Sequence, residues 1–199
     1  MPKISDERKA ERKAQILQAA WACFQAQGLH ATTMDDIIRA SDLSAGAVYS
    51  YFPSKEEIIF AAVTTSLTGL TERLRPLLAM APKNGPEWLV HAVAGSIDVF
   101  GKGVRYDLKR IALLGWSEAQ TNPKLRELMQ GFYRSFRNDL ARCVPDWKKT
   151  GYIDVSATDE QVAKSILCMV LGFVAQAAIL ADIQPDEISL RFSNPGGGL

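Results

Sequence analysis

The segment from Gln161 to Ile183, QVAKSILCMVLGFVAQAAILADI, is apolar almost all round when it is drawn as a helix. Such a helix cannot lie at the surface of a small monomer, because its apolar sides need a partner to cover them. A membrane-spanning helix needs roughly 20 predominantly apolar residues. The apolar run from Ser165 to Ala181 is shorter, contains Gln176 and has no basic flank after Ala181. We therefore expect a buried helix in a protein that does not enter a membrane.

Helical spacing also dominates the rest of the chain, with no alternating strand pattern and no internal repeat. Ile16, Ala20 and Phe24 share one helix face, and Gly28 is placed to end that helix. Thr33 and Asp36 resemble a capping box, and Ser54 with Glu57 forms another. The expected later helices are Met34–Ser41, a short one between Ser44 and Pro53, 54–80, Pro86–Phe100, Tyr106–Thr121, Pro123–Lys148 and Thr158–Asp182, with a loop at Ala81–Pro86. The predicted fold class is all-α.

The overall charge does not indicate a nucleic-acid partner, because the formal net charge of the 199 residues is only +1. Basic residues gather near the N-terminus, where acidic residues alternate with them: Lys3, Arg8, Lys9, Arg12 and Lys13. This pattern fits a solvated helical turn as well as an arm that faces phosphates.

The three cysteines, Cys23, Cys143 and Cys168, are far apart and lie among apolar residues. This spacing predicts core thiols in a reducing cytoplasm. The charged N-terminus has no apolar run of the kind that a signal peptide needs, so we expect a cytoplasmic protein.

The first 53 residues contain the elements of a helix-turn-helix: a longer helix followed by two short helices with a tight turn between them. The second short helix of such a motif lies in the major groove of DNA. Its first turn would be capped by Ser44 and consists of small residues that permit close approach to bases: Ala45, Gly46 and Ala47. Hydroxyl groups and an ammonium that could contact phosphates come from Thr33, Tyr49, Tyr51 and Lys55. A purely structural three-helix cap would explain the same composition.

The order of residues in ILQAAWACFQAQGLHATTMDDIIRASDLSAGAVYSYFPSKEEI closely resembles the DNA-binding domain of TetR-family transcription regulators. That family has I-L-x-A-A-x-x-x-F in its first helix and ends the motif with S-x-G-x-x-Y-x-[YH]-F-x-[SN]-K-[ED]. The matching positions are Ile16, Leu17, Ala19, Ala20, Phe24, Gly28, Thr32, Thr33, Ile37, Ser44, Gly46, Tyr49, Tyr51, Phe52, Ser54, Lys55 and Glu56. They span about a quarter of the chain without a gap, and so many residues at fixed spacing are highly specific.

The resemblance implies roles for individual residues. Phosphate contacts are implied for Thr33, Tyr49, Tyr51 and Lys55, and a base-facing turn for Ser44, Ala45, Gly46 and Ala47. Asp42 stands where the family usually has a glycine, and we expect a left-handed conformation there, which Asp tolerates better than most residues. Because Ala45 cannot donate a hydrogen bond to a base, DNA shape or a thymine methyl is expected to contribute to recognition.

The implied organisation is a helix-turn-helix DNA-binding domain at residues 1–53, a helical effector-binding and dimerisation domain at residues 54–192, and a flexible tail at residues 193–199. The helices at 123–148 and 158–182 would pair with the same helices of a second copy, as the family does. A dimer with two reading helices fits a palindromic double-stranded operator.

The second domain carries scattered aromatic and methionine side chains that fit either an ordinary helical core or the family's effector chamber. An apolar chamber of this kind suits a small apolar or aromatic molecule. The candidate effector contacts are Trp88, His91, Phe100, Trp116, Gln120, Phe136, Met169, Phe173 and Gln176.

The sequence shows no catalytic, metal-binding or cofactor-binding pattern. It has only two histidines, no GxSxG motif and no glycine-rich phosphate loop after a strand. We therefore expect a dimeric DNA-binding regulator, most simply a repressor that an effector releases, without enzyme activity, metal or cofactor. A helical small-molecule-binding or scaffolding protein without DNA activity is the alternative.

Overall fold

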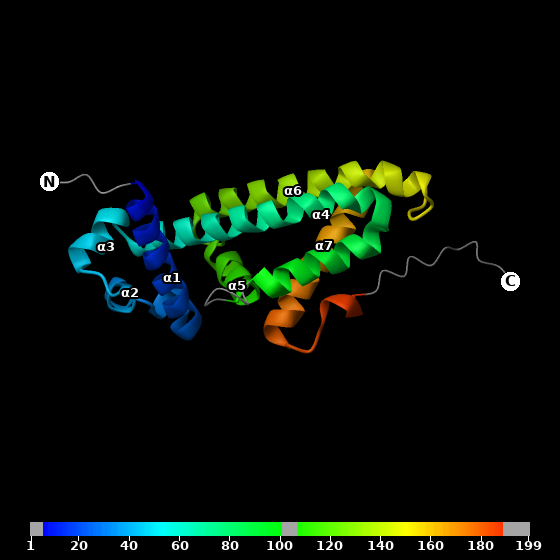
Figure 1. The fold of residues 1–199 in the computed structure, drawn as a ribbon. Coiled ribbons are helices and arrows are strands. Elements are labelled where there is room, and N and C mark those ends of the chain that lie inside the picture. Colours follow the sequence, from blue (N-terminus) through cyan, green and yellow to red (C-terminus); the bar gives the residue numbers. More distant parts are fainter. Residues whose placement is uncertain (1–5, 101–106, 189–199) are drawn as a thin grey trace.

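The computed structural model describes residues 6–100 and 107–188, with only the backbone of Phe100. This part of the chain is all-helical, as predicted. Its helices are α1 (Asp6–Ala31), α2 (Met34–Ser41), α3 (Ala45–Tyr51), α4 (Lys55–Phe100), α5 (Leu108–Glu118), α6 (Pro123–Lys149) and α7 (Asp159–Ile179), followed by a 3-10 turn at Pro185–Glu187. Helices α1, α2 and α3 gather at one end, and α4 and α6 run side by side along the molecule (Figure 1).

Local sequence signals set the bounds of the three N-terminal helices. Gly28 has a φ of 83°, a conformation that glycine adopts at no steric cost, and it breaks α1 before its last turn. Thr33 begins α2 as the N-cap of a complete capping box with Asp36. Asp42 ends α2 in the expected left-handed conformation, with a φ of 55°. Ser44 then caps α3 by accepting a hydrogen bond from the backbone N–H of Ala47.

Helix α4 differs from the prediction, because the expected loop at Ala81–Pro86 is almost entirely helical. Only Gly85 leaves the helical conformation, with φ 87° and ψ 169°. The chain reverses there, so that residues 86–100 run back beneath residues 55–84 (Figure 1). The proline and glycine residues of this segment led to the prediction of a six-residue loop. The structure reverses the chain with one non-helical residue instead.

One side chain from α6 and one from the end of the segment itself explain why the first segment of α4 continues so far. The last carbonyls of a helix have no partner within it. The indole N–H of Trp147 donates to the carbonyl of Ala81 at 2.8 Å, and Asn84 Nδ2 donates to the carbonyl of Met80 at 2.9 Å. These two side chains satisfy the carbonyls at the end of the segment, as a helix cap would.

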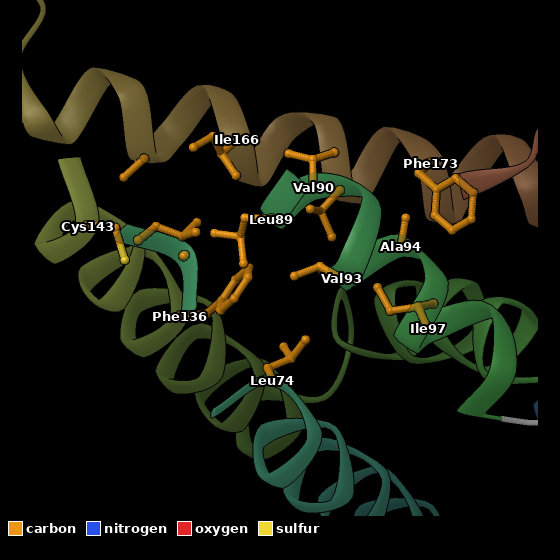
Figure 2. Packing of buried hydrophobic residues seen from close by; sticks show 14 of the residues in the cluster. Leu74, Leu89, Val90, Val93, Ala94, Ile97, Phe136, Cys143, Ile166 and Phe173 are labelled. Carbon is orange, nitrogen blue, oxygen red and sulfur yellow. The ribbon is translucent and has the colours of Figure 1, made fainter. Parts of the chain in front are cut away.

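The apolar interior forms two clusters that meet along α4. One cluster fixes the three N-terminal helices against the start of α4, and includes Ile16, Phe24, Val48 and Ile58. The other cluster lies between both segments of α4, α6 and α7. Figure 2 shows its side chains from these helices directed toward one another.

Helix α7 is not covered on all sides in the single chain, which leaves apolar surface for the second copy that the sequence predicts. By length and composition it could cross a membrane, and 33% of its most apolar stretch is buried. Its buried face includes Ile166, Val170 and Phe173, whereas Cys168 and Ile179 are exposed. Of the three predicted core thiols, only Cys143 is fully buried and Cys23 is partly so. The exposed apolar face of α7 needs a partner that the single chain does not supply.

Candidate DNA-binding surface and effector cavity

The first turn of α3 offers an open surface. Ser44, Ala45 and Gly46 are exposed, and Ala47 is half-buried. A methyl group built on Gly46 would meet no atom within 4 Å. The fold itself therefore does not require a glycine at this position. A partner that approaches the backbone closely would require one.

The opposite side of α3 fixes this turn to the protein. Val48 is fully buried and Phe52 nearly so. Tyr49 points away from this core, with 47% of its surface exposed. Tyr51 is half-buried and packs against the cluster that contains Val48. The two tyrosines among the predicted phosphate contacts therefore differ, since Tyr49 is exposed and Tyr51 is half-buried.

The hydroxyl of Thr33 is already engaged in the cap of α2. It donates to Asp36 Oδ2 at 2.7 Å and accepts from the backbone N–H of Asp36 at 3.2 Å. The hydrogen bonds from Thr33 lower the pKa of Asp36 below its ordinary value, because they stabilise the ionised carboxylate. Thr33 is exposed at the start of α2, and its established contact is with its own helix.

Lys55 has a structural role that the sequence did not indicate. Its Nζ donates to the carbonyls of Leu29 at 2.9 Å, His30 at 3.3 Å and Thr32 at 2.9 Å. A cation is favourable at the C-terminal end of a helix, where carbonyls lack partners. The ammonium therefore directs its donors to carbonyls at the end of α1. In the protein without DNA, Lys55 is not directed toward a phosphate.

Gln15 is a second contact that the sequence did not indicate. Its Nε2 donates to the carbonyl of Ser41 at 2.7 Å, which ties α1 to the end of α2. Nearby, the Nζ of Lys13 lies 5.7 Å from the ring centre of Phe52. Both contacts hold the helix-turn-helix as one unit and leave the start of α3 open.

A mainly apolar cavity lies between α4, α5, α6 and α7. The space open to the centre of a water molecule is ≈ 60 Å³. Two of the nine predicted effector residues line it, Trp116 and Phe136. The described lining is otherwise Val63, Ser66, Leu67, Leu70, Leu74, Val93, Ile97, Leu108, Ile111, Ala112, Gly115, Met129, Phe132, Tyr133, Leu167, Val170, Leu171 and Val174.

Six of the other predicted effector residues do not line this cavity. Trp88 and His91 lie in a surface depression beside Gly85 and Tyr152, and His91 Nε2 is hydrogen-bonded to the carbonyl of Ile188 at 2.5 Å. Met169, Phe173 and Gln176 border an outer groove on α7. Gln120 is exposed and donates to the carbonyl of Trp116. The side chain of Phe100 lies outside the described residues. The reversal of α4 at Gly85 places Trp88 and His91 away from the cavity, and the sequence alone did not indicate this reversal.

Ser66 and Tyr133 carry the hydroxyl groups of the described lining, and the predicted set omitted both. The indole N–H of Trp116 donates to Tyr133 Oη at 2.6 Å. Burial raises the pKa of Tyr133, because the phenolate would lose its hydration. Ser66 is 3% exposed. The signal for Ser66 was its position three residues after Val63 and four before Leu70, on an apolar helix face.

Comparison with known proteins agrees with this geometry. Residues 16–62 match the family described as bacterial regulatory proteins, tetR family, and residues 86–190 match the family described as BetI-type transcriptional repressor, C-terminal. The HTH-type transcriptional regulator YfiR of Bacillus subtilis (strain 168) is 29% identical over 191 residues, which are 94% of this chain and 90% of YfiR.

Solved structures show the same fold. GusR of Salmonella enterica is 25% identical with a TM-score of 0.66, and the match covers 90% of each chain. A transcriptional regulator from Saccharomonospora viridis, solved in complex with choline, is 20% identical with a TM-score of 0.72 over 89% of this chain and 91% of that one. The second family match spans more than half of the chain. The chain therefore belongs to the TetR family of bacterial regulatory proteins and is a helix-turn-helix transcriptional regulator.

Proposed function

We propose that this regulator binds a palindromic operator as a dimer, acts as a repressor in the cytoplasm, and is released when a small apolar or aromatic effector enters the cavity. One observation carries the proposal: residues 55–84 of α4 take part in both sites. Ile58 and Ile59 pack in the cluster that supports α3, whereas Leu70 and Leu74 line the cavity. Val63 belongs to both.

The shared helix gives a physical route from effector to DNA. The cavity is narrow, since only ≈ 60 Å³ is open to the centre of a water molecule, so a bulky effector has to push the helices that enclose it apart. A shift of α4 would move the cluster beneath α3 and change the distance between the two reading helices of a dimer. Because coupling is reciprocal, operator binding would weaken effector binding by the same factor.

We assign DNA binding and effector binding to different parts of the chain, which correspond to the two apolar clusters. Residues 1–53 would contact DNA, with Tyr49 and the turn from Ser44 to Ala47 as the exposed contacts. Residues 54–192 would hold the effector and form the dimer, with the exposed apolar face of α7 and the neighbouring α6 as the interface. The proposal gives the chain no catalytic role.

The test is to select bound sequences from a random pool of double-stranded DNA and to measure binding of the selected sequence by fluorescence anisotropy. We expect a palindrome and an affinity that falls steeply with salt, because phosphate contacts release counterions.

A pair of tyrosine variants makes this test specific. Tyr49→Phe should weaken binding about two- to tenfold, the effect of one lost hydrogen bond. Tyr152→Phe is the matched control, since Tyr152 is 48% exposed but lies beside Gly85, at the reversal of α4. Equal affinities of the two variants, or a pool that yields no preferred sequence, would contradict the proposed DNA surface.

A further inference from the structure

Ser66 carries a buried hydroxyl that the protein leaves without a partner. Among the buried side-chain oxygens and nitrogens of the described residues, its Oγ alone has no hydrogen bond. Thr64, Thr65 and Thr71 of the same helix each donate to the carbonyl four residues earlier, at 2.7, 2.8 and 2.9 Å. Ser66 makes no such bond and lines the cavity instead. An unsatisfied buried hydroxyl is costly and needs an explanation.

The hydroxyl of Tyr133, in the same cavity, can still donate its own hydrogen. Its oxygen accepts from the indole N–H of Trp116, and a phenol can accept and donate at once. Because burial raises the pKa of Tyr133, the phenol keeps its proton at neutral pH. Trp116 thus fixes the position of the oxygen and leaves the O–H hydrogen for another acceptor.

The packing of α4 on α6 places the two hydroxyls at one level. Residues 55–84 of α4 run in the same direction as α6, and the difference in residue number between contacting residues is nearly constant. Lys124 pairs with Glu57, Cys143 with Leu78 and Trp147 with Ala81, at separations of 67, 65 and 66 residues. The same offset sets Ser66 opposite Phe132 and Tyr133, and both Ser66 and Tyr133 line the cavity.

The rest of the lining disfavours a charged ligand. Among the described residues that enclose the cavity there is no Asp, Glu, Lys, Arg or His. A buried charge without a counter-charge is strongly unfavourable. The choline of the Saccharomonospora viridis complex belongs to that protein, and no carboxylate of the described lining here would balance a quaternary ammonium.

We propose that the effector of this protein is an uncharged, mainly apolar molecule with a carbonyl-type oxygen that accepts hydrogen bonds from the hydroxyls of both Ser66 and Tyr133. A carbonyl oxygen has two lone pairs and can accept both bonds. The inference rests on the proposed function only in taking the cavity as the effector site.

Three probes of similar shape test the proposal by isothermal titration calorimetry on the full chain without DNA. They are acetophenone, isopropylbenzene, in which a methyl group replaces the oxygen, and phenyltrimethylammonium, which carries a charge. The measured quantity is the ratio of the affinities for acetophenone and isopropylbenzene. We expect Ser66→Ala and Tyr133→Phe each to lower this ratio about two- to tenfold, the effect of one hydrogen bond. Phenyltrimethylammonium should show no binding at concentrations that saturate with acetophenone.

Thr64→Val is the matched control, since the hydroxyl of Thr64 is bonded within its own helix and does not line the cavity. It should leave the ratio unchanged. Ligand-free Ser66→Ala should unfold at the same temperature as the parent protein or a higher one, because it removes an unsatisfied polar group. This second readout separates a ligand contact from a structural role.

An unchanged ratio in both variants would overturn the proposal, as would tight binding of phenyltrimethylammonium or no binding of any probe. The DNA assay reports separately on the proposed function. If acetophenone binds with the expected ratios but does not release the operator, the release mechanism fails while the inference about the cavity stands. If charged molecules release the operator, the inference alone fails.

Discussion

At the scale of single residues, Lys55 shows how a side chain that matches a family position can serve the fold. We predict that Lys55→Met lowers the free energy of unfolding by about 1.5–3 kcal/mol, because it removes charged hydrogen bonds to the carbonyls at the end of α1. Urea unfolding at one fixed protein concentration measures this change. Lys124→Met is the matched control, and it should cost less than about 1 kcal/mol, since Lys124 forms an exposed ion pair.

DNA binding of the same variant separates the two roles of Lys55. A phosphate contact would make the slope of log affinity against log salt shallower by about one when it is lost. We expect the slope of Lys55→Met to equal that of the parent. A shallower slope with unchanged stability would show instead that the ammonium leaves α1 and contacts DNA.

At the scale of elements, the reversal of α4 depends on Gly85. Its φ of 87° and ψ of 169° fall in a region that is essentially restricted to glycine, and an added methyl would lie 3.1 Å from the ring of Tyr152. We predict that Gly85→Ala lowers the free energy of unfolding by about 1–3 kcal/mol. Adding Tyr152→Ala should recover little, because the backbone strain remains.

The control for this prediction is Gly95→Ala, in the second segment of α4. A methyl group there meets no atom within 4 Å, so the change should be neutral or stabilise by up to about 1 kcal/mol. Thermal and urea unfolding report on both variants. If Gly85→Ala were as stable as Gly95→Ala, the two segments of α4 would not need the conformation that glycine permits.

The start of α2 should respond to pH through Asp36. Hydrogen bonds from Thr33 lower the pKa of this carboxyl in the folded protein. Its contribution to stability is therefore fully present above the pKa of the unfolded chain and is lost as pH falls through the lower folded value. We predict that Asp36→Asn is less stable than the parent at neutral pH and that the difference shrinks between about pH 5 and pH 3.

Unfolding curves across this pH range measure the effect. Asp35→Asn removes one charge from the same turn but leaves the hydrogen bonds of Thr33 intact, so its difference from the parent should change less with pH. A difference for Asp36→Asn that stays constant or grows toward acid pH would contradict the assigned cause.

The sequence predicted elements best where the signal is local. The capping box at Thr33, the left-handed Asp42 and the broken helix at Gly28 depend on neighbours within four residues, and the structure confirms all three. The prediction of a loop at Ala81–Pro86 was wrong, because the side chain that hydrogen-bonds the carbonyl of Ala81 belongs to Trp147, 66 residues away. Lys55 reaches its carbonyls across 23 to 26 residues, and no periodic pattern indicates such a contact.

At the scale of the whole molecule, the effector cavity also depends on contacts between residues far apart in the sequence, which local patterns do not predict. Trp116 and Phe136 were predicted because large aromatic side chains are frequent around ligand cavities. Ser66 was missed because its position on an apolar helix face indicates a buried side chain but not a ligand contact, and only the packing of α4 on α6 sets it opposite Tyr133. Trp88 and His91 lie in a separate surface depression, because the chain reverses at Gly85 just before them.

The exposed face of α7 makes a prediction about assembly. Cys168, Gly172 and Ile179 recur along one side of this helix, and Ile179 is 68% exposed. A second copy is expected to cover this face, since small residues permit close approach of two helices. A methyl group on Gly172 would meet no atom within 4 Å, so the single chain can accommodate a larger side chain there. We predict that Gly172→Arg folds but stays monomeric, because two buried arginines would face each other across the interface.

Size-exclusion chromatography with light scattering at micromolar concentration measures this outcome, and circular dichroism confirms that the variant keeps its helices. Gly95→Arg introduces the same side chain at another open glycine, outside α6 and α7, and should remain dimeric. The monomeric variant should also lose most of its affinity for a palindromic operator, because each half-site would be bound alone. A parent chain that is itself monomeric would contradict the proposed dimer, and a Gly172→Arg variant that stays dimeric would place the interface on another surface.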